Sequence, residues 1–464
     1  MRRTLRTTPS PWRRWSLLAA MMLALALMAA ACAPGETDPD AADDPDPEEE
    51  PDEPDPDDPE DDEEPEDEAD ADPAELRVTV WTGSDEHLGL FDDIADEFIA
   101  EHDTVESVNF DVLPFEDYDD ALTVQLAGGN PPDLGWIFER SAPQFIEAGV
   151  LADVGPELRE SEDYDFDDIT DRALELWVED EAVYGYPFSS SPFAMFYNAD
   201  MFAEAGLDNP DELYEQGEWT WDAARDAAAT IVAEDVAGHG FVVRDMGYEL
   251  WDNLAMVWRG FGARAWSEDG SQCTMDEPEM VEAMTFFHEA VFEDQAHPAP
   301  GQSADFFTGD AAMSITQISR AGLFEDDFEW GVVPLPEGTV DAQVVGQAGV
   351  GVFDASENVE AATDFLEFWT NEENSQRMAQ FFPPPRESLL TAEILADANP
   401  WLDEAQLETV VVNAIEEGEV IPSHVNFAQL RDTIRAELDA LWVEDADPEQ
   451  VLSQVCDAAQ PLME

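Results

Sequence analysis

Lysine is absent from this chain of 464 residues, and arginine is scarce. The 18 Arg stand against 111 Asp and Glu, which gives a formal net charge of −93 at pH 7. Binding to nucleic acid or to an anionic membrane surface needs a footprint of Lys and Arg, so both kinds of partner are excluded. The acidic groups on such a surface repel one another unless salt screens their charges. At 1 M salt the Debye length is about 3 Å, and the repulsion between neighbouring acids largely vanishes. The composition therefore predicts a protein of a halophilic organism.

Sequence motifs of catalysis and of metal binding are also absent. The chain has no nucleophile elbow, phosphate-binding loop or zinc-ligand spacing, and its six His are scattered from His87 to His424. We therefore expect neither a cofactor nor a metal site.

Residues 1–31 have the layout of a bacterial lipoprotein signal peptide. Five Arg and no acid in residues 1–14 precede an apolar run over residues 17–31, which ends at Cys32. Fifteen residues are fewer than the ~20 needed to span a bilayer, so we expect cleavage there and a lipid on Cys32. That lipid would hold the protein on the outer face of the cell membrane. Cleavage without lipid is the alternative, and Arg13 with Arg14 leaves both Sec and twin-arginine export open.

Residues 32–74 are predicted to form a disordered acidic tether. Residues 36–73 contain 24 acids and nine Pro, with no aromatic or branched apolar side chain. Such a segment buries too little surface to offset the entropy of ordering it. Binding of cations or of basic partners by this segment is the alternative.

The remaining residues 75–464 carry the other 87 acids and 13 Arg, a net charge of −74. About 390 residues are too many for one core, so we expect two lobes. Strand-like residues 76–81, 108–113 and 134–138 alternate with helical apolar spacing from Leu88 to Phe98 and from Tyr118 to Leu126. This alternation predicts an α/β fold with a parallel sheet, and apolar stripes predict helices near residues 427–441 and from Pro448.

Seven motifs, in order along nearly all of this part, resemble those of extracellular solute-binding proteins of carbohydrate-uptake ABC transporters, and more distantly maltose-binding protein. They are residues 129–134 (GNPPDL), 148–151 (AGVL), 183–198 (VYGYPFSSSPFAMFYN), 219–222 (WTWD), 307–313 (FTGDAAM), 330–336 (WGVVPLP) and 418–422 (GEVIP).

The resemblance implies a two-lobed periplasmic-binding-protein-like fold with a ligand cleft and a hinge between the lobes. It places lobe 1 at residues 75–188 plus 346–398 and lobe 2 at residues 189–345 plus 399–464. The crossings are then expected near residues 187–190, near residues 345–347 and near Asn399. Pro187, Ser190, Gly346 and Gly349 are the candidate hinge residues, although ordinary turns would explain each of them equally well.

A sugar site needs flat aromatic platforms and short polar groups. Trp251 and Trp258 match the family region that stacks on ligand, but their spacing of seven is equally that of a buried helix face. The polar candidates come from loops after the first and third strands and from segments that border the family's cleft. They are Ser84, Asp85, Glu86, Glu139, Arg140, Arg386, His424 and Asn426. Any single acid is more often solvated surface.

The last two cysteines, Cys273 and Cys456, are 183 residues apart, and the sequence leaves open whether they form a disulfide. We interpret the chain as a lipid-anchored receptor, expected to be monomeric, that delivers a sugar or oligosaccharide to ABC permease subunits. A polyol or a compatible solute is the alternative ligand. A secreted carbohydrate-active enzyme is the competing class, because a glycosidase needs only two carboxylates at a set separation and acids abound here.

Overall fold

The computed structural model describes residues 73–463, apart from residues 162, 245, 247, 324–327 and 400. The predicted signal peptide, Cys32 and the predicted tether up to residue 72 lie outside the described residues. In the described part, every helix is too short or too polar to cross a membrane.

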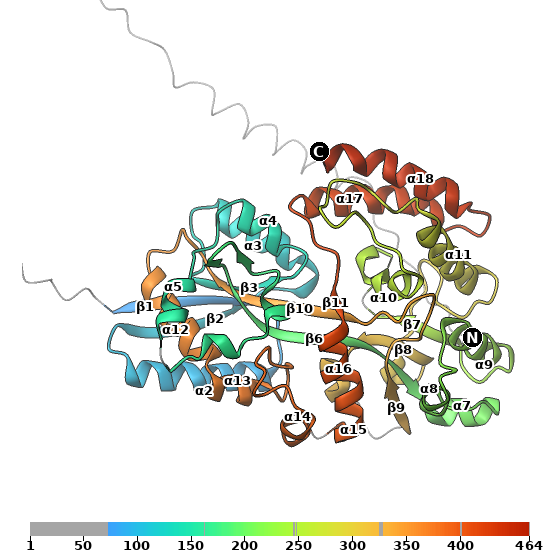
Figure 1. Cartoon of the computed structure of the whole chain (residues 1–464), viewed down its shortest axis with the longest axis horizontal. Helices are drawn as coiled ribbons and strands as arrows, with labels where there is room; N and C mark the ends of the chain where they lie inside the picture. Colours follow the sequence, from blue (N-terminus) through green and yellow to red (C-terminus); the bar gives the residue numbers. More distant parts are fainter. Residues whose placement is uncertain are drawn as a thin grey trace, which may run out of the picture. The chain divides into compact units, whose positions relative to one another are not determined.

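Nine strands of the described part form one sheet, in the order β2-β1-β3-β10-β6-β8-β7, with β11 beside β10 and β9 beside β6. Its centre is the antiparallel pair β6 (Tyr186–Asn198) and β10 (Val344–Val352), which both lobes share (Figure 1). Pairing is parallel between β1 and its neighbours β2 and β3, and between β7 and β8. The predicted parallel sheet is therefore confirmed only within each lobe. The shared strands are antiparallel because β6 leads into the second lobe and β10 leads back.

The first lobe packs around one core that extends from Leu76 to Met378. In its first helix, the side chain of Ser84 accepts a hydrogen bond from the His87 amide, and Phe91, Ile94 and Phe98 face the core. Its elements besides β6 and β10 are β1 (Ala74–Val80), α2 (Asp85–Glu101), β2 (Val105–Val112), α3 (Tyr118–Ala127), β3 (Leu134–Phe138), α4 (Ala142–Glu147), α5 (Gly155–Glu160), α6 (Asp171–Leu174), β4 (Val178–Glu179), β5 (Ala182–Val183), α12 (Val359–Thr370) and α13 (Glu372–Met378).

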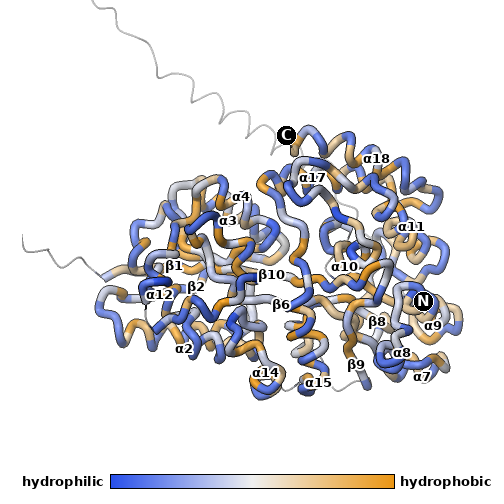
Figure 2. Tube along the Cα trace, viewed as in Figure 1, coloured by the Kyte–Doolittle hydropathy of each residue, from blue (hydrophilic) through white to orange (hydrophobic). Residues whose placement is uncertain are grey.

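The second lobe has a core on each face of its part of the sheet. Alternate residues of β6 enter one core or the other, as the pleat of a strand requires, with Phe193 in the larger and Phe196 in the smaller. Its other elements are α7 (Ala199–Ala205), α8 (Pro210–Gln216), α9 (Trp221–Ala233), β7 (His239–Val243), α10 (Ala255–Trp258), α11 (Pro278–Phe292), β8 (Ala311–Gln317), β9 (Trp330–Val333), α14 (Ala392–Ala398), α15 (Glu404–Leu407), α16 (Asn413–Glu417), β11 (Glu419–Val420), α17 (Phe427–Leu438) and α18 (Pro448–Ala459). Figure 2 shows hydrophobic and hydrophilic residues alternating along α17 and α18, which bury one face each.

Three segments pass between the lobes. In β6, Phe188 belongs to the first core and Phe193 to the second, and in β10 the change lies between Val344 and Ala348. The third change precedes the predicted crossing at Asn399, because Leu390 already packs into a core of the second lobe. That lobe thus begins again before residue 399, and the prediction placed the boundary too late.

Close packing accounts for the two glycines proposed as hinge residues. A Cβ on Gly346 would lie 2.0 Å from Nε2 of Gln317, and one on Gly349 would lie 2.4 Å from the Trp177 ring. Any larger residue would push these neighbours away, whether or not the segment bends. Pro187 and Ser190 lie buried within β6.

A disulfide joins Cys273 to Cys456 in the second lobe. It links the segment after α10 to the C-terminal helix α18, and Gln460 reinforces the contact by accepting a hydrogen bond from the Cys273 amide at 3.0 Å. The cross-link closes a loop of 183 residues, so it strongly restricts the unfolded chain.

Replacing both residues (Cys273→Ser with Cys456→Ser) should therefore lower the free energy of unfolding by about 2–4 kcal/mol. Denaturant titration at one fixed, high salt concentration measures this change. Wild type treated with reductant should unfold like the variant, since both lack the cross-link. Equal stability of the variant and the untreated wild type would show that the bridge contributes nothing.

Candidate functional site

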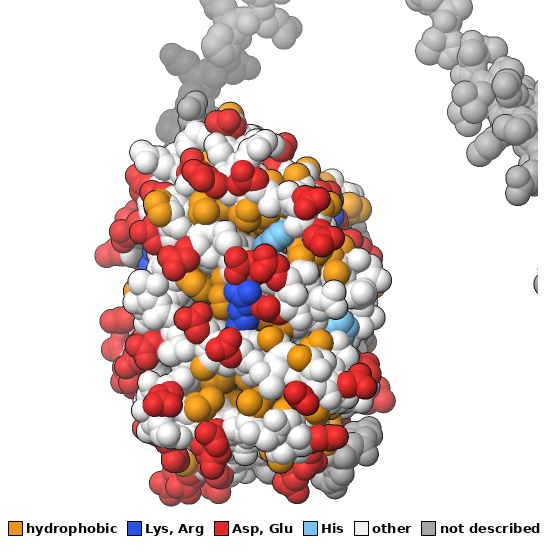
Figure 3. Space-filling model, turned by 90° about the vertical axis from the view of Figure 1, so that its right-hand side faces the viewer, with side chains coloured by type: hydrophobic (Ala, Val, Ile, Leu, Met, Phe, Trp, Pro, Cys, Tyr) orange, Lys and Arg blue, Asp and Glu red, His pale blue; other side chains and the backbone are white. Residues whose placement is uncertain are grey.

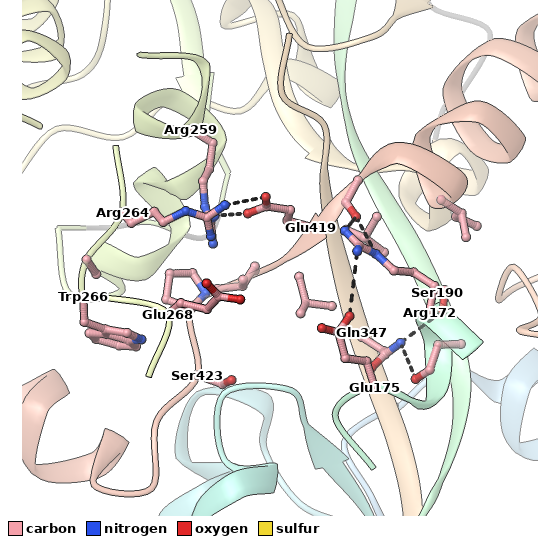
Figure 4. Close-up of a pocket in the computed structure, with 18 of the residues that line it drawn as sticks. Arg172, Glu175, Ser190, Arg259, Arg264, Trp266, Glu268, Gln347, Glu419 and Ser423 are labelled. Carbon is pink, nitrogen blue, oxygen red and sulfur yellow. Dashed lines mark hydrogen bonds and ion pairs between the residues drawn. The ribbon is translucent and has the colours of Figure 1, made fainter. Parts of the chain in front are cut away.

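A cavity of about 480 Å³ lies between the lobes, against the shared strands. Its walls come from α6 of the first lobe, from the crossings in β6 and β10, from the segment after α10, and from the β11 segment (Figure 4). The side chains that give it its chemistry are Arg172, Glu175, Ser190, Arg259, Arg264, Trp266, Glu268, Gln347, Glu419 and Ser423.

Gln347 fixes the floor of the cavity at the crossing. Its Oε1 accepts a hydrogen bond from the Trp177 indole at 2.8 Å, and its Nε2 donates to the Ala173 carbonyl at 3.1 Å. The same Nε2 lies 3.5 Å from the Ser190 hydroxyl. This side chain therefore ties β10, β6 and α6 together where they meet the cavity.

Arg172 connects the first lobe to the β11 segment. It lies in α6, which Thr170 caps by accepting from the Ala173 amide. Its guanidinium donates from Nε to the Gly418 carbonyl at 3.1 Å, and its Nη1 lies 3.8 Å from a Glu175 carboxylate oxygen. Arg172 thus places positive charge on the first-lobe wall.

Two arginines on the opposite wall share a single carboxylate. Arg259 Nη1 contacts one oxygen of Glu419, and Arg264 Nη2 donates to the other at 2.5 Å. Burial alone would raise the pKa of Glu419, but the hydrogen bond from Arg264 and the charge of Arg259 outweigh it and lower that pKa. The carboxylate therefore stays ionised, and the group of three carries one net positive charge.

Trp266 supplies an aromatic face on the same wall. The imidazole of His424 packs edge-on against the Trp266 ring, with 5.4 Å between the centroids. The backbone of Trp266 forms a β-bridge with Cys273, one of the two disulfide cysteines. His424 Nδ1 accepts from the Asn426 amide, so its Nε2 carries the proton and donates to the Gly270 carbonyl at 2.9 Å. A flat ring held this firmly, next to Arg, Glu, Gln and Ser groups, suits a ligand with an apolar face and a rim of hydroxyls.

Trp251 and Trp258 do not line this cavity. They are 1% and 0% exposed and belong to the larger core of the second lobe, where Trp251 donates to the Arg431 carbonyl. The alternative interpretation, packing of a buried helix face, is what the structure shows. Trp266, eight residues further on and 9% exposed, belongs to the same core and also lines the cavity.

Arg386 and Asn426 also have structural partners away from the cavity. Arg386 is 0% exposed, donates to the carbonyls of Asp165 and Thr370 at 3.0 and 3.1 Å, and lies over the Tyr164 ring. The side chain of Asn426 donates to the Leu462 carbonyl at 2.8 Å. Their positions in the sequence suggested the cleft, but their hydrogen bonds hold the fold.

The loop after β1 presents Ser84 as the cap of α2 and Asp85 and Glu86 in its first turn. Both acids are exposed there, and their charge is favourable at the positive end of the helix. They do not line the cavity, so the structure gives them a role in the helix terminus.

Glu139 and Arg140 belong to a second buried polar cluster, which does not line the cavity but adjoins it, because the Glu139 amide donates to the Gln347 carbonyl at 3.3 Å. Arg140 lies 4.0 Å above the Phe138 ring and donates from Nε to Asp119 at 3.3 Å. Asp252 of the second lobe interacts electrostatically with both Glu139 and Arg140, and neither of its carboxylate oxygens has a hydrogen-bond partner among the described residues. Charges of both lobes therefore meet at this point.

Burial is the main cause of unusual protonation in this cluster. It raises the pKa of Glu139 to about 7, with Arg140 opposing the rise and Asp252 adding to it. Burial also raises the pKa of Asp252, against the charges of Arg140 and Arg431. Ionisation of Glu139 is thus costly in the folded protein.

Sequence reasoning missed Arg172, Arg259, Arg264, Trp266, Gln347 and Glu419 as site residues. The motif at residues 418–422 was recognised, but nothing in it indicated that Glu419 would pair with two arginines. The scarcity of Arg was the available signal, since three of the 13 Arg in residues 75–464 line this one cavity.

We predict that Glu139→Gln stabilises the protein at pH 8, by at most about 3 kcal/mol. The folded protein holds this proton up to a higher pH than the unfolded chain, so wild type loses stability as the pH rises from about 4.5 to about 7. The variant should lack that part of the loss. Denaturant titrations at pH 4.5 and pH 8 measure it, with exposed Glu86→Gln as the control for removing one charge. A pH dependence identical to that of wild type would contradict the role of Glu139.

Comparison with known proteins identifies the family. The family model of bacterial extracellular solute-binding proteins matches residues 85–376. A putative binding protein of Brucella abortus is 23% identical over 85% of this chain and 95% of its own length. The arabinooligosaccharide-binding protein of Bacillus subtilis is 24% identical over 82% and 91%. The structure of an ABC substrate-binding protein from Listeria monocytogenes in complex with cycloalternan superposes with a TM-score of 0.74, at 26% identity, over 84% of this chain and 99% of that one. Two lobes, a cavity at their crossings and these matches agree: the chain belongs to the family of bacterial extracellular solute-binding proteins.

Proposed function

We propose that this protein is the lipid-anchored substrate-binding component of an ABC importer and that it captures a sugar or an oligosaccharide outside the cell. The observation that carries this proposal is the cavity, where the Trp266 ring lies beside convergent donors and acceptors from both lobes. An aromatic face matches the C–H face of a pyranose, and Gln347, Ser190 and the Arg–Glu pairs match its hydroxyls.

The matched relatives support a saccharide as the ligand class. One relative is named for arabinooligosaccharides, and the solved structure from Listeria monocytogenes holds cycloalternan. The cavity of about 480 Å³ is within the ordinary size range of small-ligand sites, so it could hold a short saccharide.

Capture would proceed by movement of the lobes about the three crossings. Gln347 and Ser190 lie on two of these crossings and Glu419 lies beside them, so a ligand bound to all three would favour one arrangement of the lobes. A permease could then recognise that arrangement. A lipid on Cys32 and the acidic tether would keep the domain near the membrane that holds the permease.

Trp266→Ala should weaken saccharide binding by about 1–3 kcal/mol, because it removes the aromatic face while most of the ring's neighbours remain. A thermal-shift screen of a saccharide library in high salt would first identify the ligand, since ligand at ~100 times its dissociation constant adds about 2.7 kcal/mol to stability. Calorimetry then compares the variants. Trp401→Ala removes a tryptophan that is 45% exposed and outside the cavity, so it should bind like wild type. Unchanged affinity in a folded Trp266→Ala variant would remove Trp266 from the site, and release of a chemically altered saccharide would indicate an enzyme instead.

The acidic surface should make folding depend on salt. Figure 3 shows Asp and Glu spread over the face it displays, with Lys or Arg visible at few points. At ~0.01 M ionic strength the Debye length is about 30 Å, so most of these charges repel one another, whereas at 1 M they affect only near neighbours.

We therefore expect the melting temperature to rise steeply between about 0.01 M and 1 M salt, because the unfolded chain spreads the same charges farther apart. Circular dichroism follows the unfolding, and sucrose serves as an uncharged stabiliser that screens nothing. A melting temperature that stays constant across the salt series would show that the acidic composition is not an adaptation to salt.

A further inference from the structure

Positive charge is concentrated at the cavity between the lobes. Arg172, Arg259 and Arg264 line it, although residues 75–464 contain only 13 Arg and no Lys among 87 acids. Three acids, Glu175, Glu268 and Glu419, line it as well, so the cavity is close to neutral within a domain of net charge −74. A second cavity of about 350 Å³ in the same lobe as β9 contains Glu337, Asp341 and Glu417 and no arginine. Neutrality therefore distinguishes this cavity from the second one.

The positive charge on the second-lobe wall is only partly compensated. Arg259 and Arg264 share the carboxylate of Glu419, and the Nε of Arg259 has no hydrogen-bond partner among the described residues. Burial, together with the nearby charge of Arg264, lowers the pKa of Arg259 to about 10 against the pull of Glu419. An additional anion beside these two guanidinium groups would relieve their mutual repulsion.

Arg264 is the group best placed to receive that anion. Its side chain is 51% exposed, and within the described part of the chain it contacts Glu419 through Nη2 alone. A guanidinium presents five N–H donors in a planar fork that matches a carboxylate. Arg264 therefore has N–H groups that can still donate hydrogen bonds to a ligand. In Figure 4 Arg264 and Trp266 lie on the same side of the cavity, which places the charged group next to the aromatic face.

We infer that the ligand of this cavity is an acidic saccharide of the uronic acid class, with its ring against Trp266 and its carboxylate against Arg264 and Arg259. This inference rests on the proposed function and adds the charge of the ligand to it. A carboxylate carries one negative charge, which balances the single net positive charge of Arg259, Arg264 and Glu419. A phosphate ester carries about −1.5 to −2 at neutral pH and would exceed the single positive charge of this group of three.

Matched pairs of ligands test the inference. Isothermal titration calorimetry at one salt concentration compares glucose with glucuronate, galactose with galacturonate, mannose with mannuronate, and neutral with acidic disaccharides. Glucose 6-phosphate and galactose 6-phosphate form the phosphate arm. We expect the uronate of the recognised pair to bind at least about tenfold more tightly than its neutral partner, since hydrogen bonds between charged groups discriminate to this extent. The phosphate ester should bind more weakly than the uronate.

Two variants assign the effect to the cavity. Arg264→Gln should reduce the ratio of uronate to neutral affinity by about tenfold. Because Arg264 is half exposed, the variant should remain folded. Arg435→Gln removes the same charge from an exposed position on α17 outside the cavity and should leave the ratio unchanged. The salt dependence of uronate affinity should likewise decrease in Arg264→Gln and not in Arg435→Gln.

Several outcomes would overturn the inference, and they separate it from the proposed function. Tighter binding of the neutral sugars, or an unchanged ratio in Arg264→Gln, would refute the acidic ligand and leave a saccharide receptor. Preference for the phosphate ester would refute the carboxylate. Failure of every saccharide to bind the folded protein would refute both proposals.

Discussion

The antiparallel pairing of β6 with β10 is the contact on which the rest of the structure depends. Each strand begins in one lobe and ends in the other, so a single ladder of hydrogen bonds connects two separate cores. The short strand β11 joins the same ladder, with Val344 opposite Glu419. Gln347, Ser190 and Glu419 therefore reach the cavity because of strand register, and a shift by one residue would turn their side chains to the other face of the sheet.

Arginine is used sparingly in this protein, and its positions follow a pattern. Away from the cavity, Arg77 pairs with Asp111 and Arg377 with Glu97, and each of these contacts joins segments far apart in the sequence. In a chain with so many acids, each Arg can find a partner, whereas most acids cannot. These arginines, like those of the cavity, mark places where two parts of the fold are held together.

Local pattern predicted the secondary structure well, but none of the ten predicted ligand-binding residues lines the cavity. The strand at residues 134–138 and the helix with apolar residues from Phe427 to Leu438 appear as expected. The spacing of apolar residues along the chain indicates directly which side of an element is buried. The same period cannot tell a ligand-stacking tryptophan from a core one, and Trp251 and Trp258 proved to be core. Arg386 shows the same limit, since its position near the cleft did not reveal that backbone carbonyls bind its guanidinium. Whether a polar group is buried, and which groups it contacts, depends on residues distant in the sequence. A local sequence pattern does not contain that information.

The contact between the lobes brings together like charges as well as partners. Glu139 and Asp252 come from different lobes and are both buried, with Arg140 and Arg431 as the nearby compensating charges. A pair of buried carboxylates opposes close approach, whereas the contact of Arg431 with Asp120 at 4.0 Å and the hydrogen bond from the Ala428 amide to Gln144 favour it. These contributions to the contact between the lobes oppose one another. A ligand that bridges the walls of the cavity can shift the balance between arrangements of the lobes only by its difference in affinity for them.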